Sequence, residues 1–225
     1  MVINMDVIEA IRSRKSIRGY KRTPVPEEVI SEILRAAIQS PSTMNTQPWK
    51  INVITGESLE KLKKGNVKML NEGVRPHPET HLFRFEDKYR ERQVNLAKQI
   101  FNLIGIARED KKRRAEWMER GFRIFDAPAA IILSMDRSLD KSALSMLDMG
   151  AVTQTICLAA LKYGLGTCIE DLGIMYPEVV RDVTGIAESE QIIICIAIGY
   201  PDWDFPANKL ETVREPLDSM LKWYR

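Results

Sequence analysis

The stretch R-S-R-K-S-I-R, from Arg12 to Arg18, decides how the rest of this chain is interpreted. It places three arginines, one lysine and two serines within seven residues. Guanidinium groups bind phosphate through paired hydrogen bonds, and short hydroxyls suit a sugar or ribityl chain. The alternative is a solvated basic helix end, where Lys and Arg complement the helix dipole. This stretch alone does not choose between the two.

The composition excludes several classes of protein. The net charge is only +2 over 225 residues, without a long basic block, so we expect no nucleic-acid partner. No apolar run approaches the length that spans a bilayer, and acidic residues near the start argue against a signal peptide. The cysteines Cys157, Cys168 and Cys195 are widely spaced, which is typical of reduced thiols. We therefore expect a cytoplasmic protein without a membrane partner.

The apolar pattern predicts an alternation of helices and short strands. Asp6 and Glu9 form a plausible capping pair for a helix that leads into the basic stretch. Further helices are expected around residues 29–38, 89–104, 110–122 and 145–163, and strands at 51–54, 129–133, 167–170 and 191–199. Gly56 should end the first strand, and Ser58 could cap a helix after it.

Two of these segments are unusually apolar. The helix expected from Ser145 to Tyr163 is apolar around almost its whole circumference, so it should be buried on all sides. In a chain of this size, that predicts a helix shared with a partner subunit. The run Q-I-I-I-C-I-A-I-G, from Gln191 to Gly199, suits a central strand that is covered on both faces.

A second motif, P-S-T-M-N-T-Q-P-W from Pro41 to Trp49, favours the ligand-binding interpretation of the basic stretch. Standing alone, it could be a polar loop after a helix, closed by a buried tryptophan. Together the two motifs resemble the signature of the flavin-dependent nitroreductase family. In that family an N-terminal R-x-S-x-R/K element and a P-S-x-x-N-x-Q-P-W loop contact FMN.

The resemblance assigns a role to each matching residue. Arg14 and Lys15 would serve the FMN phosphate, Ser16 the ribityl hydroxyls, and Arg18 the N1/O2 edge of the flavin ring. A reduced flavin carries negative charge near that edge, which a cation stabilises. In the second motif, the polar residues would reach the flavin across a dimer interface, and Met44 would face its open side; the polar residues are Ser42, Thr43, Asn45 and Gln47.

Two later segments continue the resemblance. G-L-G-T-C-I-E-D, from Gly164 to Asp171, is similar to a family segment whose backbone approaches flavin N5, which implies main-chain roles for Glu170 and Asp171. Cys168 within it is interpreted as a core residue. R-E-P-L from Arg214 is similar to an element whose arginine reaches the phosphate. Relatives often carry a second basic residue where Val213 stands, and Lys209 is a candidate substitute.

Residues 73–125 form an irregular and then helical block, which we interpret as an insertion within a single domain of residues 1–225. Family members often carry a substrate lid there, so Tyr89 and Arg92, with Met44, are candidate substrate contacts. An exposed, charged helix face is the alternative. His77 and His81 are separated by Pro78 and lack a third ligand, so we expect no metal site.

The resemblance implies an α+β fold, with a mostly antiparallel central sheet wrapped by helices, in an intertwined homodimer. It implies FMN chemistry in which NAD(P)H reduces the flavin and a nitroaromatic or quinone then takes its place. No side chain is assigned a catalytic role, because hydride transfer requires positioning and electrostatics. Two alternatives stay open: different flavin chemistry, such as reductive dehalogenation or dehydrogenation of a small metabolite, and a non-catalytic flavin-binding protein. The choice between NADH and NADPH and the natural acceptor stay undecided.

Overall fold

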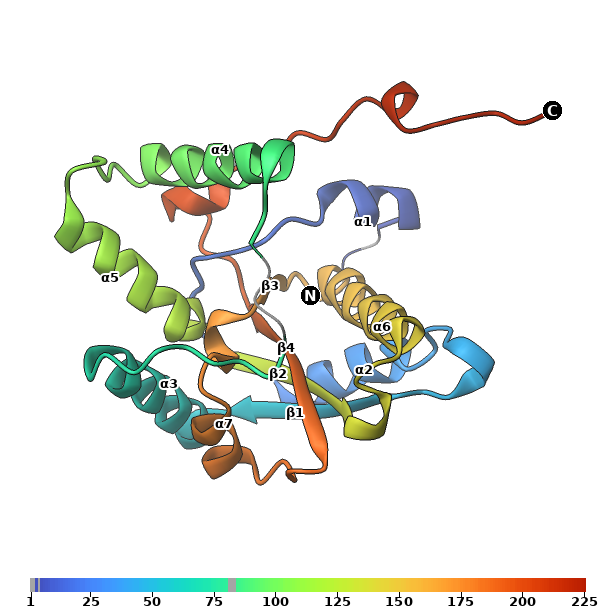
Figure 1. Cartoon of the computed structure of the whole chain (residues 1–225), viewed down its shortest axis with the longest axis horizontal. Helices are drawn as coiled ribbons and strands as arrows, with labels where there is room; N and C mark the ends of the chain where they lie inside the picture. Colours follow the sequence, from blue (N-terminus) through green and yellow to red (C-terminus); the bar gives the residue numbers. More distant parts are fainter. Residues whose placement is uncertain (1–2, 4, 81–83) are drawn as a thin grey trace.

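An antiparallel sheet of four strands forms the centre of the computed structural model, which describes residues 3, 5–80 and 84–225. The strands lie in the order β1-β2-β4-β3 (Figure 1). They are β1 (Trp49–Thr55), β2 (Ala129–Asp136), β3 (Gly166–Glu170) and β4 (Glu190–Gly199). The inner strands β2 and β4 are almost entirely buried. The predicted antiparallel sheet and the central place of the 191–199 run are therefore confirmed.

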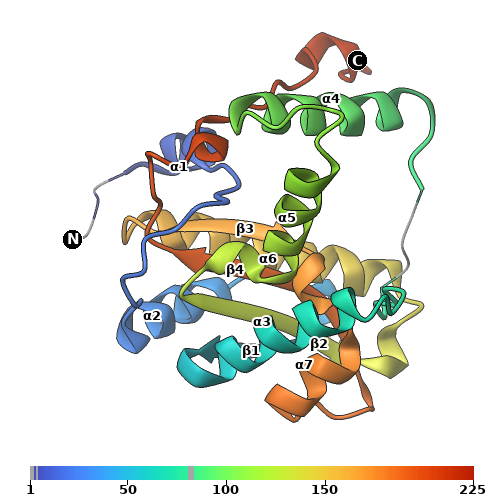
Figure 2. The same ribbon diagram turned by 90° about the vertical axis from the view of Figure 1, so that its left-hand side faces the viewer.

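Helices cover both faces of this sheet. The described residues contain α1 (Val7–Ser13), α2 (Glu27–Ala37), α3 (Gly56–Asn71), α4 (Asp87–Leu103), α5 (Lys111–Phe122), α6 (Ala143–Leu161) and α7 (Pro177–Thr184). The apolar faces of α2 and α6 pack on one side of β2 and β4. On the other side, α3 and α7 lie next to each other, as both views show (Figures 1 and 2).

Two local predictions need correction. The helix after the first strand begins at Gly56, not behind a Ser58 cap, because β1 runs to Thr55 and Gly56 turns with a φ of +54°. Glycine adopts this left-handed conformation without steric cost, so strand and helix join directly. In addition, α7 was not predicted. It begins with Pro177 and ends at the left-handed Gly185, which are ordinary helix boundaries.

The apolar helix is confirmed as α6, but one subunit does not cover it. Among the described residues, it is the one helix long and apolar enough to cross a membrane by length and composition. Its inner face supplies Met149, Val152 and Ile156 to the core, as a core helix does. Its outer face leaves Leu144 54% and Leu147 68% exposed. Helix α6 would therefore be buried on every side only if a further surface covered its outer face.

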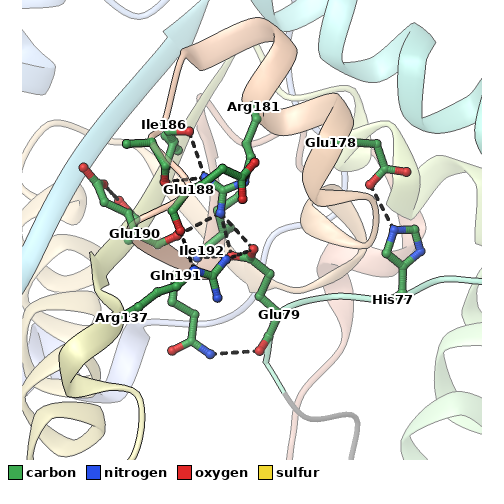
Figure 3. Close-up of polar contacts among 12 residues, drawn as sticks. His77, Glu79, Arg137, Glu178, Arg181, Ile186, Glu188, Glu190, Gln191 and Ile192 are labelled. Atoms are coloured by element: carbon green, nitrogen blue, oxygen red, sulfur yellow. Dashed lines mark hydrogen bonds and ion pairs between the residues drawn. The ribbon is translucent and has the colours of Figure 1, made fainter.

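Glu79 fastens the start of the 73–125 block to the sheet (Figure 3). Its carboxylate accepts hydrogen bonds from Arg181 at 2.8 and 3.0 Å, from Arg137, and from the backbone N–H of Ile192 at 2.7 Å. Gln191 Nε2 donates to its backbone carbonyl at 2.8 Å. Although burial alone raises the pKa of Glu79, the Ile192 N–H and the two guanidinium groups bring that pKa below its usual value.

Candidate functional site

Residues 14–18 of the basic stretch form an extended segment beside β3, because α1 ends at Ser13. Ser16 pairs with Thr167 of β3 in a parallel bridge, and the Ile17 N–H donates to the Thr167 carbonyl at 2.9 Å. The Ile17 side chain is buried and anchors the segment. Of the three arginines, Arg12 alone lies in the last turn of α1. A solvated basic helix end therefore does not describe residues 14–18.

Arg14, Lys15 and Arg18 are half-buried cations. In the described parts of the chain, none of the three takes part in an ion pair. A partly desolvated cation interacts more strongly with an anion than one in bulk water does. The segment consequently offers unpaired positive charge where the family resemblance expects phosphate and flavin.

A buried asparagine fixes the backbone of Arg18. Its N–H donates to Oδ1 of Asn208 at 2.7 Å, and Asn208 Nδ2 donates to the carbonyls of Gly19 and Asp202 at 2.8 and 2.7 Å. Gly19 is required here, because a Cβ would lie 2.3 Å from the ring of Phe205. Nothing in the sequence around Asn208 signals this role, and the sequence analysis missed it.

The loop after α2 holds an unusual backbone. Met44, Asn45 and Gln47 have φ angles of +51°, +58° and +46°, which non-glycine residues adopt at an energetic cost. Ser42 Oγ accepts a hydrogen bond from the Gln47 N–H at 2.9 Å and closes the loop. The Met44 side chain is 92% exposed. Such a conformation persists where the surroundings enforce it, and it is common at ligand sites.

Asp148 of α6 is a second functional residue that the sequence analysis missed. It is 5% exposed, and both carboxylate oxygens accept from the Thr43 N–H at 3.1 Å. It is the lone acidic residue of an otherwise apolar helix, and that isolation was the available signal. In one subunit, no hydrogen bond or ion pair among the described residues joins loop 42–47 to the basic segment 14–18, so Asp148 and β3 place the two motifs independently.

Glu170 and Asp171 lie at the end of β3, the strand that also pairs with Ser16. The Glu170 side chain points inward, and its Oε2 accepts from the Gly173 N–H at 2.9 Å. Burial raises the pKa of Glu170 to about 7, against smaller opposing effects of the Cys195 thiol and the Gly173 N–H. The same strand thus joins the basic segment to the backbone of residues 170–171.

The pKa of Glu170 predicts an unusual pH dependence of stability. An unfolded glutamate titrates near 4.3, so between that pH and about 7 the folded state binds more protons. The free energy of unfolding should therefore fall as pH rises through this window, by about 3–4 kcal/mol in total. Glu170→Gln should abolish this fall and exceed the parent in stability at about pH 8.

Urea unfolding of the two proteins across this pH range measures the difference. Glu28→Gln, at an exposed position of α2, is the matched control and should keep the parental pH dependence. Parallel curves for Glu170→Gln and the parent would contradict a raised pKa at Glu170.

Cys168 is confirmed as a core residue. It is 2% exposed, and burial raises its pKa to about 12. Nucleophilic cysteines need accessible thiolate, which this environment suppresses. Cys157 and Cys195 are also buried free thiols.

The remaining candidates lie near the tail and in α4. Arg214 is exposed, and its guanidinium donates to Thr212 Oγ1 at 2.7 Å; no hydrogen bond or ion pair in the described residues joins it to Arg14 or Lys15. Lys209 ends a short 3-10 helix and is also exposed. Tyr89 is 55% exposed, with Arg92 5.7 Å from its ring centroid. Arg92 also contacts Glu215 at 2.6 Å, which ties α4 to the tail.

The described residues contain no group of three potential metal ligands. His77 Nε2 lies 3.0 Å from Glu178, and Nδ1 lies 2.9 Å from the Arg75 carbonyl. His77 is therefore part of a surface contact. His81 lies outside the described residues.

Comparisons with known proteins agree with this geometry. A family model described as "Nitroreductase family" matches residues 11–200. The chain is 32% identical over 213 residues to a chloronitrobenzene nitroreductase of Comamonas testosteroni, with 93% of each chain covered. It is also 32% identical over 211 residues to a 4-nitrobenzoate reductase of Pseudomonas putida, with 93% of this chain and 92% of the relative covered.

Solved structures show the same similarity. The FMN and NADPH-dependent nitroreductase NfnB from Sphigopyxis sp. strain HMH superimposes with a TM-score of 0.93 at 27% identity, covering 98% of this chain and 100% of its own. The FMN-dependent nitroreductase NfnB from Mycobacterium smegmatis, in complex with NADPH, gives a TM-score of 0.90 at 25% identity with the same coverage.

Proposed function

The chain belongs to the nitroreductase family, and we propose that it is an NAD(P)H-dependent FMN oxidoreductase that reduces nitroaromatic compounds and similar electron-poor acceptors. The observation that carries this proposal is the set of half-buried, unpaired cations at residues 14, 15 and 18 beside the end of β3. The two relatives described above, which share more than nine-tenths of their length with this chain, are named as reductases of nitroaromatic compounds, which favours this function over dehalogenation or simple flavin binding.

The residues present fit FMN. Arg14 and Lys15 supply unpaired charge for one phosphate, Ser16 a hydroxyl, and residues 170–171 a backbone at the end of β3. Arg18, whose backbone N–H is held by Asn208, would supply positive charge for the flavin ring. When bound, FMN takes a hydride from NAD(P)H and passes it to the acceptor. The chain therefore has to bind, orient and stabilise charge, and no side-chain acid or base is required.

Met44, Tyr89 and Arg92 are proposed to meet the acceptor. Met44 and Tyr89 expose 92% and 55% of their surface, and Lys88 and Arg92 flank the Tyr89 ring at 5.4 and 5.7 Å from its centroid. An aromatic ring between two cations suits an aromatic acceptor that carries negative charge, such as a nitrobenzoate. The block of residues 73–125, which contains α4, would act as a lid over the bound acceptor.

Stopped-flow mixing of the purified protein tests the proposed function. The purified protein should be yellow and should release FMN, not FAD, on heating. When NADH or NADPH is mixed with it in the absence of oxygen, the absorbance of the oxidised flavin should disappear during the stopped-flow measurement. A second mixing step with 4-nitrobenzoate, a chloronitrobenzene or a quinone should restore the absorbance. Flavin that binds but is not reduced by either nucleotide would favour the non-catalytic alternative, and reoxidation by a halogenated substrate alone would favour dehalogenation.

We infer that the functional unit is an intertwined homodimer. Helix α1 has no buried residue, and its Val7, Ile8 and Ile11 are at least half exposed. The tail extends away from the body (Figure 1), with Trp223 75% and Tyr224 87% exposed. Strand β1 lies at an edge of the sheet, where an extended segment can add by backbone pairing. A second copy that covers these surfaces and α6 would also bring loop 42–47 to the flavin of its neighbour.

A single charge on the outer face of α6 should therefore break the dimer. Leu147 is 68% exposed, so Leu147→Glu should be harmless in a monomer but should bury a charge in a dimer. We expect Leu147→Glu to sediment as a monomer and to lose FMN at concentrations where the parent is an FMN-loaded dimer. Met118→Glu, at a 50% exposed position of α5, is the control and should stay dimeric. A monomeric parent that retains FMN would refute the dimer.

The compartment is proposed to be the cytoplasm. The three free, buried cysteines fit a reducing environment, and NAD(P)H is available there.

A further inference from the structure

A second ligand site lies outside the residues assigned to FMN and to the acceptor. We propose that the cavity of about 980 Å³ between α3, α5 and the segment around residue 22 binds a multiply charged phosphate group, of the class found in pyrophosphate and nucleoside polyphosphates. None of the residues assigned to FMN or to the acceptor lines this cavity, which we call the basic cavity. The proposal goes beyond the proposed function and does not depend on it.

The charge of its lining is the first observation. Six basic side chains line the basic cavity against two acidic ones, Glu60 and Asp126, which leaves four net positive charges. The whole chain carries a net charge of only +2, so the rest of the chain is net negative. The basic residues come from three separate parts of the chain: Arg22; Lys63, Lys64 and Lys68; Arg120 and Arg123. A cavity lined by one sign of charge concentrates ligands of the other sign.

The acidic residues do not satisfy this charge. Glu60 contacts Lys63 at 2.9 Å, and Asp126 is shared between Arg120 and Arg123 at 3.0 and 2.8 Å. Two acidic residues outside the lining, Glu119 and Glu72, also pair with Arg123 and Lys68. Within the described residues, Arg22 and Lys64 take part in no ion pair, and the buried Nε of Arg120 has no hydrogen-bond acceptor. A buried donor without an acceptor costs about 1–3 kcal/mol, which a bound anion would recover.

The backbone beneath the basic cavity is strained. Ile124, Phe125 and Asp126 have φ angles of +55°, +53° and +57°, and the left-handed region is especially unfavourable for a β-branched residue such as Ile124. This turn places the Asp126 carboxylate between Arg120 of α5 and Arg123, the residue that caps the C-terminus of that helix. Persistent strain of this kind clusters at ligand sites, because it holds side chains in place before the ligand arrives.

Aromatic packing fixes the orientation of Arg120. Its guanidinium carbon lies 4.6 Å from the ring centroid of Phe205, and Phe205 stacks on Trp117 at 6.4 Å. Asp126 and the Phe125 carbonyl hold the terminal nitrogens on the other side. A guanidinium fixed in this way is in place before a ligand arrives. Each terminal nitrogen carries two N–H groups, so donors remain for phosphate oxygens beside those that Asp126 and Phe125 use.

Size and distribution of charge favour several phosphates over one small anion. The cations belong to two helices and a loop around a space far larger than a single ion needs. A pyrophosphate or longer chain can contact more than one of these elements at once. Free pyrophosphate and a nucleoside diphosphate share this chemistry, and the basic cavity recognises the phosphates in either case.

Titration calorimetry of the FMN-saturated protein tests the proposal. Separate titrations with inorganic pyrophosphate and with ADP distinguish free phosphate chains from nucleotides. Lys64→Glu/Lys68→Glu reverses two charges of the basic cavity on the exposed side of α3 and should weaken pyrophosphate binding at least about tenfold. Arg22→Glu, in a different part of the chain, should also weaken pyrophosphate binding.

Two controls locate the binding. Lys61→Glu/Lys141→Glu changes the net charge equally at exposed positions that do not line the cavity, and should bind as the parent does. Arg35→Glu, at an exposed position of α2 outside the basic cavity and the proposed FMN site, should also keep pyrophosphate binding. No heat of binding in the parent at millimolar pyrophosphate, equal loss in the control double variant, or loss in Arg35→Glu would each overturn the proposal.

Discussion

Glu79→Gln should strongly destabilise the protein. Both Arg137 and Arg181 approach the Glu79 carboxylate in the parent. In the described residues, the glutamine would leave Arg137 without a counter-ion and Arg181 with the exposed Glu188 alone. Removing one partner of a buried ion pair costs about 3–5 kcal/mol, and Glu79 retains 13% of its side-chain exposure, so we expect a loss of about 2–4 kcal/mol. Urea unfolding at one fixed protein concentration measures it, because the stability of any oligomer depends on concentration.

Glu188→Gln is the matched control for this prediction. Glu188 contacts the same Arg181 at 3.4 Å, but its side chain is 86% exposed. Exposed ion pairs contribute about 0–1 kcal/mol, so this variant should stay close to the parent. Equal losses in the two variants would mean that the Glu79 cluster is an ordinary surface network.

The pH dependence of the Glu79 variant follows from the direction of its pKa shift. Because the folded-state pKa is lowered, the stabilisation is fully present above the usual carboxyl pKa and is lost as pH falls through the folded value. The stability curves of the parent and of Glu79→Gln should therefore diverge at neutral pH and converge in acid. This is opposite in sign to the behaviour expected for Glu170.

The sheet could be predicted from the sequence because its signals are local. The run from Gln191 to Gly199 is apolar on both faces, and the fold places β4 between β2 and β3. The α6 pattern was equally clear, since a 19-residue helix with one acidic side chain has few other interpretations. In contrast, the start of α3 depended on the backbone at Gly56, which the sequence pattern does not encode uniquely.

The missed residues act over long distances in the sequence. Asn208 contacts Arg18, 190 residues away, and Asp148 contacts Thr43, 105 residues away. Glu79 receives hydrogen bonds from residues 58 to 113 positions away. Periodicity and motif spacing report neighbours along one element, so they carry no information about such contacts. The motifs predicted which residues face the ligand, and the structure shows the distant residues that hold those motifs in place.

The arrangement around Arg18 implies a role distinct from that of Arg14. Both are half-buried, and neither has an ion pair in the described part of the chain. Arg18 differs because buried Asn208 fixes its backbone, and its guanidinium carbon lies 6.0 Å from the ring centroid of Phe125. A cation held in place before reduction stabilises the negative charge that reduction adds, without the cost of reorganising its surroundings. Arg14 should contribute mainly to phosphate binding, which is the same before and after reduction.

Arg18→Ala should therefore lower the midpoint potential of bound FMN and slow its reduction by NAD(P)H, while the cofactor stays bound. A charge-assisted hydrogen bond contributes about 1.5–3 kcal/mol, and about 1.4 kcal/mol corresponds to about 30 mV for a two-electron couple. The expected shift is thus about 30–60 mV. Arg14→Ala should instead weaken FMN retention and leave the potential almost unchanged. Spectroelectrochemical titration at saturating FMN, with equilibrium dialysis for retention, separates the two; a parental potential in Arg18→Ala beside a shifted one in Arg14→Ala would reverse the assignment.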